Sequence, residues 1–442
     1  MPIRLDHPAQ AYLSGETLAL RMLEPADAAA PVAWRPHPFP LSTARAGKLL
    51  EREVPEAAEA RRRTLVAVRH ADGALLGAVH LDEGYPVTVE TTFWLPETLG
   101  PGADGVAAEM LRIVVPWLSD EWGVPSVWVE WPACWAETTA AAEAIGMRPG
   151  IRLREAARRG GERHDLLGWE QLNPVWLARM GDPGVGLESE GPPTPPAEVP
   201  KPAPRAWRAG GPVPAGALVV GDRLALRPLQ VEDAAPIARS FLEERETFFL
   251  RGRRPLSPIT LADWIGKMGE TSPPTDIELA VVTRENALVG EVNLMEIDWV
   301  ARTAETAAWI YRAEHRGGGL GGEAKHLLLE YAFDRLGLHA LRSHIYDSNA
   351  RSAAAVAGQG YRQAAISGRS TSMPDSSAGR FSRSSRGNGG RRDEGDVSGQ
   401  GGFPLTRPRA VLRATPRSPF PLGLARGTPR TGASSRRAGR RA

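Results

Sequence analysis

The chain has 442 residues, 42% hydrophobic and 24% charged, which supports two or three domains with hydrophobic cores and excludes a fibrous or wholly disordered protein. The net charge of +2 combines an acidic main part with a basic C-terminal segment, residues 363–442, that holds 16 arginines and four acidic residues. The single cysteine, Cys134, excludes an internal disulfide and a multi-cysteine zinc site. The apolar stretches are shorter than the roughly 18 residues of a membrane helix, and the N-terminus lacks the pattern of a secretory signal, so we expect a cytoplasmic protein.

An internal repeat divides the chain into two related parts. Residues 18–23 recur at 224–229, residues 75–81 at 288–294, and residues 90–95 at 305–310. Segments that recur in a constant order indicate two copies of one structural unit. We therefore predict two domains, residues 12–181 and 217–362, joined by residues 182–216, whose prolines favour an extended, semi-rigid linker.

The second copy alternates between strand and helix patterns. β-Branched and polar residues alternate in the predicted strands, and apolar residues recur at helical spacing in the predicted helices. The predicted order is a strand at 224–228, a helix from 231, strands at 278–283, 288–294 and 306–311, a glycine-rich loop, a helix that ends near Gly337, a strand at 340–346 and a short helix from Asn349. We expect an α/β (α+β) fold, a mixed and mainly antiparallel sheet flanked by helices with one strand–loop–helix crossover at its centre.

The C-terminal segment differs in composition. Residues 363–442 are rich in Ser, Gly, Pro and Arg and show no sustained apolar periodicity. Such a segment buries too little apolar surface to offset its chain entropy, so we predict a disordered tail. An arginine-rich tail also suits nucleic-acid binding, which stays open as an alternative function.

A glycine-rich loop, Arg316–Glu323, lies between the predicted strand at 306–311 and an amphipathic helix. Glycines allow successive backbone N–H groups to point into one concavity, and the helix that follows adds the positive end of its dipole. Arg316 adds a cation. A plain flexible turn is the alternative, but the position between strand and helix favours a pyrophosphate-binding loop.

The loop resembles the coenzyme A pyrophosphate loop of the GNAT acetyltransferases, in which an Arg or Gln, two residues, a Gly, one residue and a Gly or Ala follow one another. Arg316, Gly319 and Gly321 have this spacing. The surroundings are similar to the RimJ/RimL branch at residues 226–229, 233–234, 290, 323–324, 331–333, 349–352 and 359–361. The similarity is strong over residues 218–362, whereas over residues 12–178 it comes chiefly through the repeat. It implies two GNAT (acyl-CoA N-acyltransferase) domains and an acetyl-CoA-dependent N-acetyltransferase that moves the acetyl group directly to a primary amine of a protein N-terminus or a small molecule.

The same resemblance implies a set of cofactor contacts. The backbone of the strand would contact acetyl-CoA, and the loop would hold its pyrophosphate; the residues are Trp309, Ile310, Tyr311, Arg316, Gly317, Gly318, Gly319, Leu320, Gly321 and Gly322. Asn349 matches an asparagine that faces the cofactor in the family. An Asn at this point is also a good helix N-cap, so both roles stay open.

Catalytic roles are less specific in the sequence. Glu305 lies where some GNAT enzymes carry the base that deprotonates the amine, although it could also form a cross-strand ion pair, and Glu291 is a rival. The family often places a tyrosine acid where Val356 stands here, so Ser352 is the nearest candidate to protonate the leaving thiolate. The four histidines of the second copy lack the paired spacing of a helical metal site, and we expect solvated or capping roles and no metal. They are His315, His326, His339 and His344.

The first copy departs from the pattern where the chemistry would occur. Gly102–Glu109 aligns with the loop but lacks the arginine, and it introduces Asp104, which would repel a pyrophosphate. Trp135 replaces the aligned Asn349, and Pro116 is expected to interrupt the helix after the loop. We predict a degenerate, non-catalytic first domain that packs on the second and supports it or shapes its acceptor site. A second active centre is the alternative, because Glu90 aligns with Glu305.

The end of the second copy also departs from the family, in which two final strands follow the segment equivalent to Gly360–Tyr361. The first copy shows such strands at 151–155 and 164–172, whereas residues 363 onward show no equivalent. We therefore expect the second domain to lack its closing hairpin. A catalytically inactive ligand-binding or scaffolding protein with the GNAT fold is the further alternative.

Overall fold

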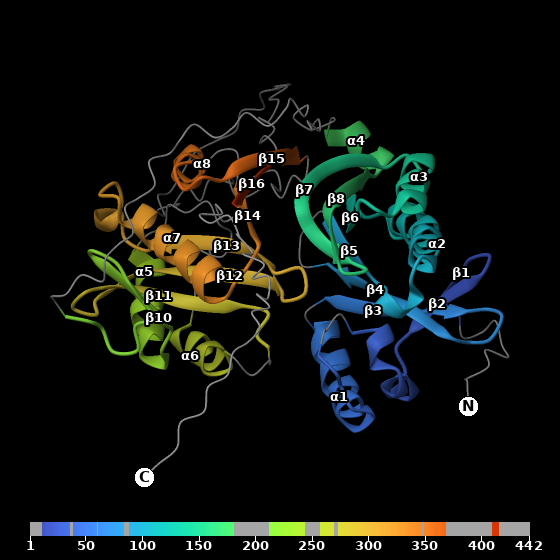
Figure 1. Cartoon of the computed structure of the whole chain (residues 1–442), viewed down its shortest axis with the longest axis horizontal. Helices are drawn as coiled ribbons and strands as arrows, with labels where there is room; N and C mark the ends of the chain where they lie inside the picture. Colours follow the sequence, from blue (N-terminus) through green and yellow to red (C-terminus); the bar gives the residue numbers. More distant parts are fainter. Residues whose placement is uncertain are drawn as a thin grey trace, which may run out of the picture.

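The computed structural model describes residues 11–35, 39–59, 61–83, 88–180, 212–243, 257–268, 273–345, 349–367 and 409–414. They form two units, the first blue to green and the second yellow-green to red in Figure 1. Most of the predicted linker and of the predicted disordered tail lies outside the described residues. Within the described part of the chain, no helix combines the length and the apolar character needed to cross a membrane.

The first unit contains eight strands and four α-helices among the described residues. They are β1 (Leu13–Ser14), β2 (Leu18–Met22), α1 (Thr43–Glu59), β3 (Arg62–Arg69), β4 (Leu75–Asp82), β5 (Thr88–Trp94), α2 (Gly102–Pro116), β6 (Ser126–Pro132), α3 (Ala136–Ala144), β7 (Arg148–Arg159), β8 (Glu162–Leu172) and α4 (Pro174–Met180). The strands form one sheet in the order β1-β2-β3-β4-β5-β6-β8-β7.

The second unit repeats this arrangement. Its elements are β9 (Val219–Val220), β10 (Leu224–Pro228), α5 (Ala234–Glu243), α6 (Pro258–Gly266), β11 (Ile277–Thr283), β12 (Leu288–Asp298), β13 (Thr303–Ile310), α7 (Leu320–Glu330), β14 (Ala340–Ile345), α8 (Ala350–Ala357), β15 (Arg362–Ser367) and β16 (Arg409–Ala414). The sheet order is β9-β10-β11-β12-β13-β14-β16-β15, the same topology as in the first unit. The predicted fold class is confirmed, because both sheets are antiparallel except for one central parallel pair, β5–β6 or β13–β14.

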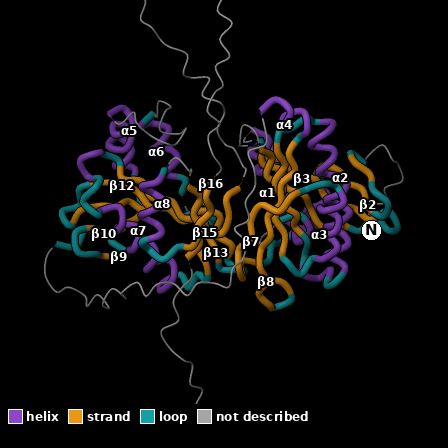
Figure 2. Tube along the Cα trace, turned by 90° about the horizontal axis from the view of Figure 1, so that it is seen from above, coloured by secondary structure: helices purple, strands orange, loops and turns teal. Residues whose placement is uncertain are grey.

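Helices cover both faces of the second sheet (Figure 2). The apolar side chains of α7 pack on one face, where Ala324, Leu327 and Leu328 are fully buried against the strands. Helices α5 and α6 cover the other face through Ile237, Phe241 and other apolar residues. Burial of these two layers on either side of the strands fixes the ends of β13 and β14, where the candidate site lies.

The closing strands of the second unit are present among the described residues, contrary to the expectation from the sequence. β16 pairs antiparallel with β14 and β15, in the places that β8 and β7 take in the first unit. The hairpin escaped prediction because 41 residues separate its two strands and the apolar part of β16 is only Ala410–Leu412, flanked by arginines. β15 lies beside β7 of the first unit.

The interruption expected at Pro116 does not distinguish the two copies. Helix α2 passes into a π-helical turn at Trp117–Glu121, and α7 passes into the same kind of turn at Tyr331–Arg335 without a proline. A π turn absorbs one extra residue in a helix, so it accommodates Pro116. This departure of the first copy is therefore not a defect of its fold.

A buried ion pair at the start of each copy preserves the repeat in three dimensions. Arg227 binds Asp233 through two hydrogen bonds of 2.7 and 2.8 Å, and both side chains are buried. Arg21 and Asp27 form the equivalent pair in the first unit at 2.9 and 2.7 Å. The guanidinium fork matches the carboxylate in both, and each aspartate also accepts a hydrogen bond from a backbone N–H.

The substitution Asp233→Ala is expected to destabilise the protein by about 3–5 kcal/mol, because it leaves the Arg227 charge buried without its carboxylate. Urea unfolding measures the effect. Asp263→Ala is the control, since Asp263 forms an exposed pair with Lys267 and should cost less than about 1 kcal/mol. Similar losses for both variants would contradict this account of the buried pair.

Candidate functional site

The glycine loop is tied to the end of β13. Arg316 donates from Nε to the carbonyl of Ile310 at 3.0 Å and from Nη2 to the carbonyl of Tyr311 at 2.6 Å. Gly317 and Gly319 have φ values of +82° and +81°, in the left-handed region that favours glycine. In this structure the Arg316 side chain therefore fixes the turn against the strand.

The loop leaves open space at the N-terminus of α7. Among the described residues, no heavy atom lies within 4 Å of the position that a Cβ would take at Gly317 or Gly318. Arg223 donates to the carbonyl of Gly318 at 2.8 Å. It also forms an ion pair with Glu323, at the end of the loop, at 2.9 Å. The backbone is thus held in place while its outer surface stays accessible, as anion binding by N–H groups at a helix N-terminus requires.

The first copy builds a different structure at the aligned position. Helix α2 begins at Gly102, four residues before the position aligned with the start of α7. The carboxylate of Asp104 accepts hydrogen bonds from the backbone N–H of Glu137 at 2.9 Å and of Thr138 at 2.8 Å. Asp104 therefore caps α3, and an extra helical turn replaces the left-handed glycine loop.

The central parallel strands separate early in the second unit. β13 and β14 pair only from Thr303↔Ala340 to Glu305↔Arg342. Beyond this point, side chains make the contacts: Ser343 Oγ donates to the carbonyl of Thr306 at 2.9 Å. In the first unit the pairing continues to Thr92↔Glu130, two residues farther. The gap that forms where the two parallel strands separate, here called the wedge, therefore begins two residues earlier in the second unit, which carries the glycine loop.

Glu305 lies where the wedge opens, and its carboxylate meets His344. His344 Nδ1 lies 2.7 Å from Glu305 Oε2, and the two side chains are only 12% and 13% exposed. Arg342 Nε lies 3.8 Å from the same oxygen. A carboxylate that accepts from one imidazole nitrogen orients the ring and leaves the other nitrogen to exchange protons.

The solvated or capping role expected for His344 is wrong. The missed signal is its spacing from Arg342, because residues i and i+2 of a strand share one face, and Arg342 pairs with Glu305 on the adjacent strand. The rival carboxylate is engaged elsewhere: Glu291 is buried and accepts a hydrogen bond from the Tyr311 hydroxyl at 2.9 Å.

A second polar cluster lies behind β13, on the side covered by α7. Lys325 Nζ donates to Thr306 Oγ1 at 2.6 Å, and the Tyr361 hydroxyl lies 2.8 Å from the same oxygen. The Lys325 ammonium also lies over the Tyr361 ring, 5.4 Å from its centroid. Burial lowers the pKa of Lys325 from 10.5 to about 7, and burial raises the pKa of Tyr361.

The substitution Lys325→Met is expected to remove a pH dependence of stability. Between pH 7 and 10.5 the unfolded chain binds more protons than the folded one, because only the folded lysine has a lowered pKa, so wild-type stability rises with pH in this window. The unfolding free energy of Lys325→Met minus that of the wild type should therefore decrease as the pH rises from 7 towards 10.5. Chemical denaturation at several pH values measures it, with the exposed Lys267→Met as control. A pH-independent difference would contradict the lowered pKa.

The remaining candidate residues lie around the same sheet end. Asn349 is buried and caps α8, because its Oδ1 accepts from the backbone N–H of Ser352 at 3.1 Å. Val356 is buried in the core. Trp309 packs its ring edge-on against Phe241, with centroids 4.6 Å apart. The structure thus gives Asn349 its capping role, whereas the cofactor role stays a prediction.

Helix α8 is also joined to the loop. Gln359 Nε2 donates to the carbonyl of Gly322 at 3.0 Å, so the chain after α8 is fixed to the first turn of α7. Ser352 is half-buried in the first turn of α8. Arg316 joins the loop to Ile310 and Tyr311, and Gln359 joins it to the chain after α8, so these candidate cofactor residues lie together. Glu305 and His344 instead line a cavity between the two units.

A cavity of about 820 Å³ lies between the two units and includes Glu305 and His344 in its lining. Three arginines, among them Arg159 and Arg342, line it beside six carboxylates and six aromatic side chains. The carboxylates are Glu90, Glu97, Glu130, Glu296, Asp298 and Glu305. The excess of negative charge and the aromatic faces suit a cation.

Direct contacts join the units around this cavity. Arg342 Nη1 lies 3.5 Å from Glu130 Oε2, and His339 Nε2 lies 2.9 Å from Glu155 Oε2. Arg163 of the first unit donates to the carbonyl of Ala301 in the second at 2.9 Å. Among the described residues, no group of three or more His, Cys, Asp or Glu side chains is arranged to hold a metal ion.

Comparisons with known proteins find similarity to acetyltransferases over part of the chain. Residues 223–362 match the family model of the acetyltransferase (GNAT) domain. A solved presumed acetyltransferase from Sphaerobacter thermophilus is 35% identical and covers 36% of this chain and 97% of its own, with a TM-score of 0.31. A spermidine N-acetyltransferase from Vibrio cholerae is 19% identical over 44% of this chain and 95% of its own, with a TM-score of 0.30. A presumed ribosomal-protein-serine acetyltransferase from Vibrio cholerae is 19% identical over 46% of this chain and 99% of its own, with a TM-score of 0.31. No match was found among curated proteins.

Proposed function

Because the chain belongs, through residues 223–362, to the GNAT acetyltransferases, we propose that it is an acetyl-CoA-dependent N-acetyltransferase that moves an acetyl group directly to a primary amine. The observation that carries this proposal is the pairing of an open glycine loop at the start of α7 with a wedge that opens after Glu305. The loop can bind the pyrophosphate of acetyl-CoA, and the wedge can admit the arm of the same molecule that carries the thioester.

The cofactor residues have distinct tasks in this proposal. The N–H groups of Gly317–Gly322 bind the pyrophosphate oxygens, and Arg316 holds the loop in the conformation that presents them. Strand groups at Trp309–Tyr311, beyond the last β13–β14 pair, contact the pantetheine arm. Asn349 fixes α8 beside this arm through its cap.

The proton leaves the acceptor through the pair of Glu305 and His344. Glu305 holds His344 by Nδ1, and Nε2 takes a proton from the acceptor ammonium. The neutral amine could then attack the thioester carbonyl. The proton that its nitrogen still has to lose would pass to the departing coenzyme A sulfur, relayed by the Ser352 hydroxyl or by solvent, so that amide and thiol both end neutral. Glu305 thus acts as the orienting carboxylate, and His344 takes the role of base that the sequence suggested for Glu305.

The cavity between the units is the proposed acceptor site. Its carboxylates and aromatic faces favour a cationic amine, at a small molecule or at a protein N-terminus of the kind that RimJ/RimL enzymes acetylate. In this proposal residues 12–181 form a degenerate GNAT-like domain that supplies one wall, and residues 217–362 form the catalytic domain. Asp104 occupies the aligned loop position in the first domain, which supports its non-catalytic role.

Release of coenzyme A tests the proposed function. The full-length protein is incubated with acetyl-CoA and one acceptor: spermidine, a peptide with an N-terminal serine, or a primary amine that carries no other charge. The coenzyme A thiol that is released is then measured. We expect amine-dependent release that is fastest with a cationic acceptor. Saturable acetyl-CoA binding without release for any amine would favour the inactive binding protein instead.

A further inference from the structure

We propose that the active centre is composite: Glu130 of the first unit is a positioning residue that holds Arg342 away from Glu305, so that Glu305 stays available to His344. This inference rests on the proposed function, because it assigns a role to the first unit in the same reaction. It explains why a chain with one glycine loop retains a second unit of the same topology.

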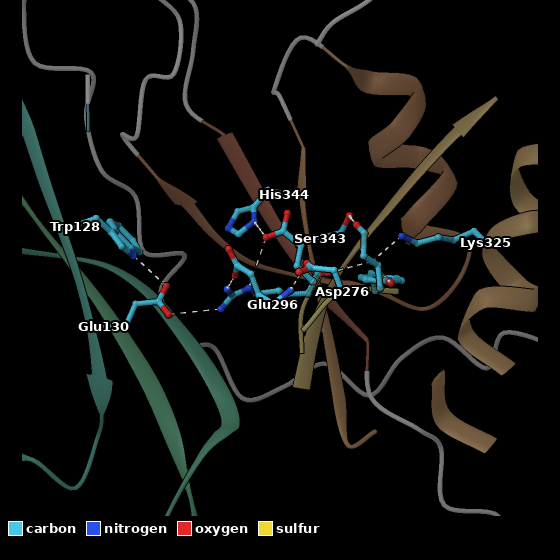
Figure 3. Close-up of polar contacts among 11 residues, drawn as sticks. Trp128, Glu130, Asp276, Glu296, Lys325, Ser343 and His344 are labelled. Atoms are coloured by element: carbon cyan, nitrogen blue, oxygen red, sulfur yellow. Dashed lines mark hydrogen bonds and ion pairs between the residues drawn. The ribbon is translucent and has the colours of Figure 1, made fainter. Parts of the chain in front are cut away.

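Arg342 lies at the centre of three carboxylates from three strands. Its Nη1 lies 3.5 Å from Glu130 on β6, its Nη2 is hydrogen-bonded to Glu296 on β12, and its Nε lies 3.8 Å from Glu305 on β13. Figure 3 shows Glu130 on the first unit reaching towards Glu296 and His344 on the second. Burial alone would lower the pKa of Arg342, but the charges of Glu130, Glu296 and Glu305 raise it, so the guanidinium stays charged.

Glu305 is shared between two cationic partners. Its Oε2 lies 2.7 Å from His344 Nδ1 and 3.8 Å from Arg342 Nε. A guanidinium fork binds a carboxylate more strongly than an imidazole does, so Arg342 would displace His344 if nothing else held it. Glu130 and Glu296 hold the two terminal nitrogens of the guanidinium, and this leaves the short contact of Glu305 to His344.

Glu130 is itself fixed within its strand. Its Oε1 accepts a hydrogen bond from Trp128 Nε1 at 3.0 Å, and it forms the last pair of the β5–β6 ladder with Thr92. An offset of 214 residues aligns Trp128 with Arg342 and Glu130 with His344. The first copy therefore lacks its own arginine and histidine at these positions and presents a carboxylate to the arginine of the second copy.

Other titratable groups lie around this cluster on the surrounding elements. They are Glu90 and Asp298 on the cavity wall, Asp276 next to Glu296, Lys325 and Tyr361 behind β13, and the Glu155–His339 pair at the edge of the interface. Glu130 differs from all of them because it comes from the first unit and contacts Arg342. Loss of its charge leaves one more net positive charge beside His344, which disfavours protonation of the imidazole.

The test compares Glu130→Gln with Glu130→Asp, which keeps the charge, and with Glu155→Gln, which removes a different carboxylate that bridges the two units. Imidazole ¹⁵N NMR of the full-length protein, with the His344 signal assigned by its absence in His344→Gln, gives the midpoint of the His344 titration. We expect the midpoint to fall by about half a pH unit in Glu130→Gln and to stay unchanged in the other two. Turnover of Glu130→Gln should fall about 10-fold, with the KM for acetyl-CoA unchanged.

An unchanged or raised midpoint in folded Glu130→Gln would overturn the inference, and so would an equal fall in Glu155→Gln. The NMR readout separates this inference from the proposed function. A lowered midpoint in a protein that acetylates no amine supports the coupling and contradicts the activity. An active wild type whose Glu130→Gln variant keeps the midpoint and the turnover supports the activity and contradicts the coupling.

Discussion

Replacement of Gly318 by aspartate is expected to raise the KM for acetyl-CoA at least about 100-fold. The substitution copies Asp104 of the first unit into the loop of the second. The backbone has no left-handed φ at Gly318, and no described heavy atom lies within 4 Å of its Cβ position, so the fold should accept the side chain. A carboxylate within about 5 Å of a pyrophosphate, at the low effective dielectric of a protein surface, is repelled by several kcal/mol.

Gly318→Ser is the matched control, because serine fills similar space without a charge. Its KM for acetyl-CoA should stay within a few-fold of wild type. Thermal unfolding checks that both variants keep the stability of the wild type. An aspartate variant with unaltered KM would place the pyrophosphate elsewhere and remove the main support for this loop as the cofactor site.

Replacement of His344 by glutamine is expected to lower kcat about 100-fold or more, with little change in acetyl-CoA binding. The imidazole is the group that Glu305 orients towards the cavity, and general bases of this kind typically contribute 100- to 10,000-fold to a rate. Glutamine keeps a polar contact to Glu305 but cannot take the proton. Steady-state kinetics with a saturating cationic amine measure the effect.

The control for this variant is His339→Gln, since His339 pairs with Glu155 outside the cavity lining and should keep full turnover. Glu305→Gln should fall between the two, because it removes the orienting charge but leaves the imidazole. Turnover of His344→Gln at the wild-type rate would show that water or another group removes the proton.

The local pattern of the second copy predicted its fold well. The strand at 224–228 has the bounds of β10, and the predicted strands at 278–283 and 288–294 lie within β11 and β12. These strands are buried on both faces, so apolar and β-branched residues dominate their sequence. The internal repeat predicted two related units, and the two described sheets have the same strand order.

Features that depend on long-range contacts could not be predicted in the same way. The pair of β15 and β16 joins segments 41 residues apart, and neither segment has a strong strand pattern. The contact of Glu305 with His344 needs the parallel register of β13 and β14, and the contact of Arg342 with Glu130 needs the packing of the two units. The glycine loop was visible in the sequence because its left-handed turns at Gly317 and Gly319 require glycine, which the sequence shows directly.

The number of acetyl-CoA molecules bound per chain tests the central claim most directly, that the second unit binds the cofactor and the first supports it. Isothermal titration of acetyl-CoA into the full-length protein should show one saturable site per chain, and Gly318→Asp should abolish it. Two sites per chain, or a single site that survives Gly318→Asp, would contradict the assignment. A folded protein that binds no acetyl-CoA would contradict the proposed acetyltransferase itself.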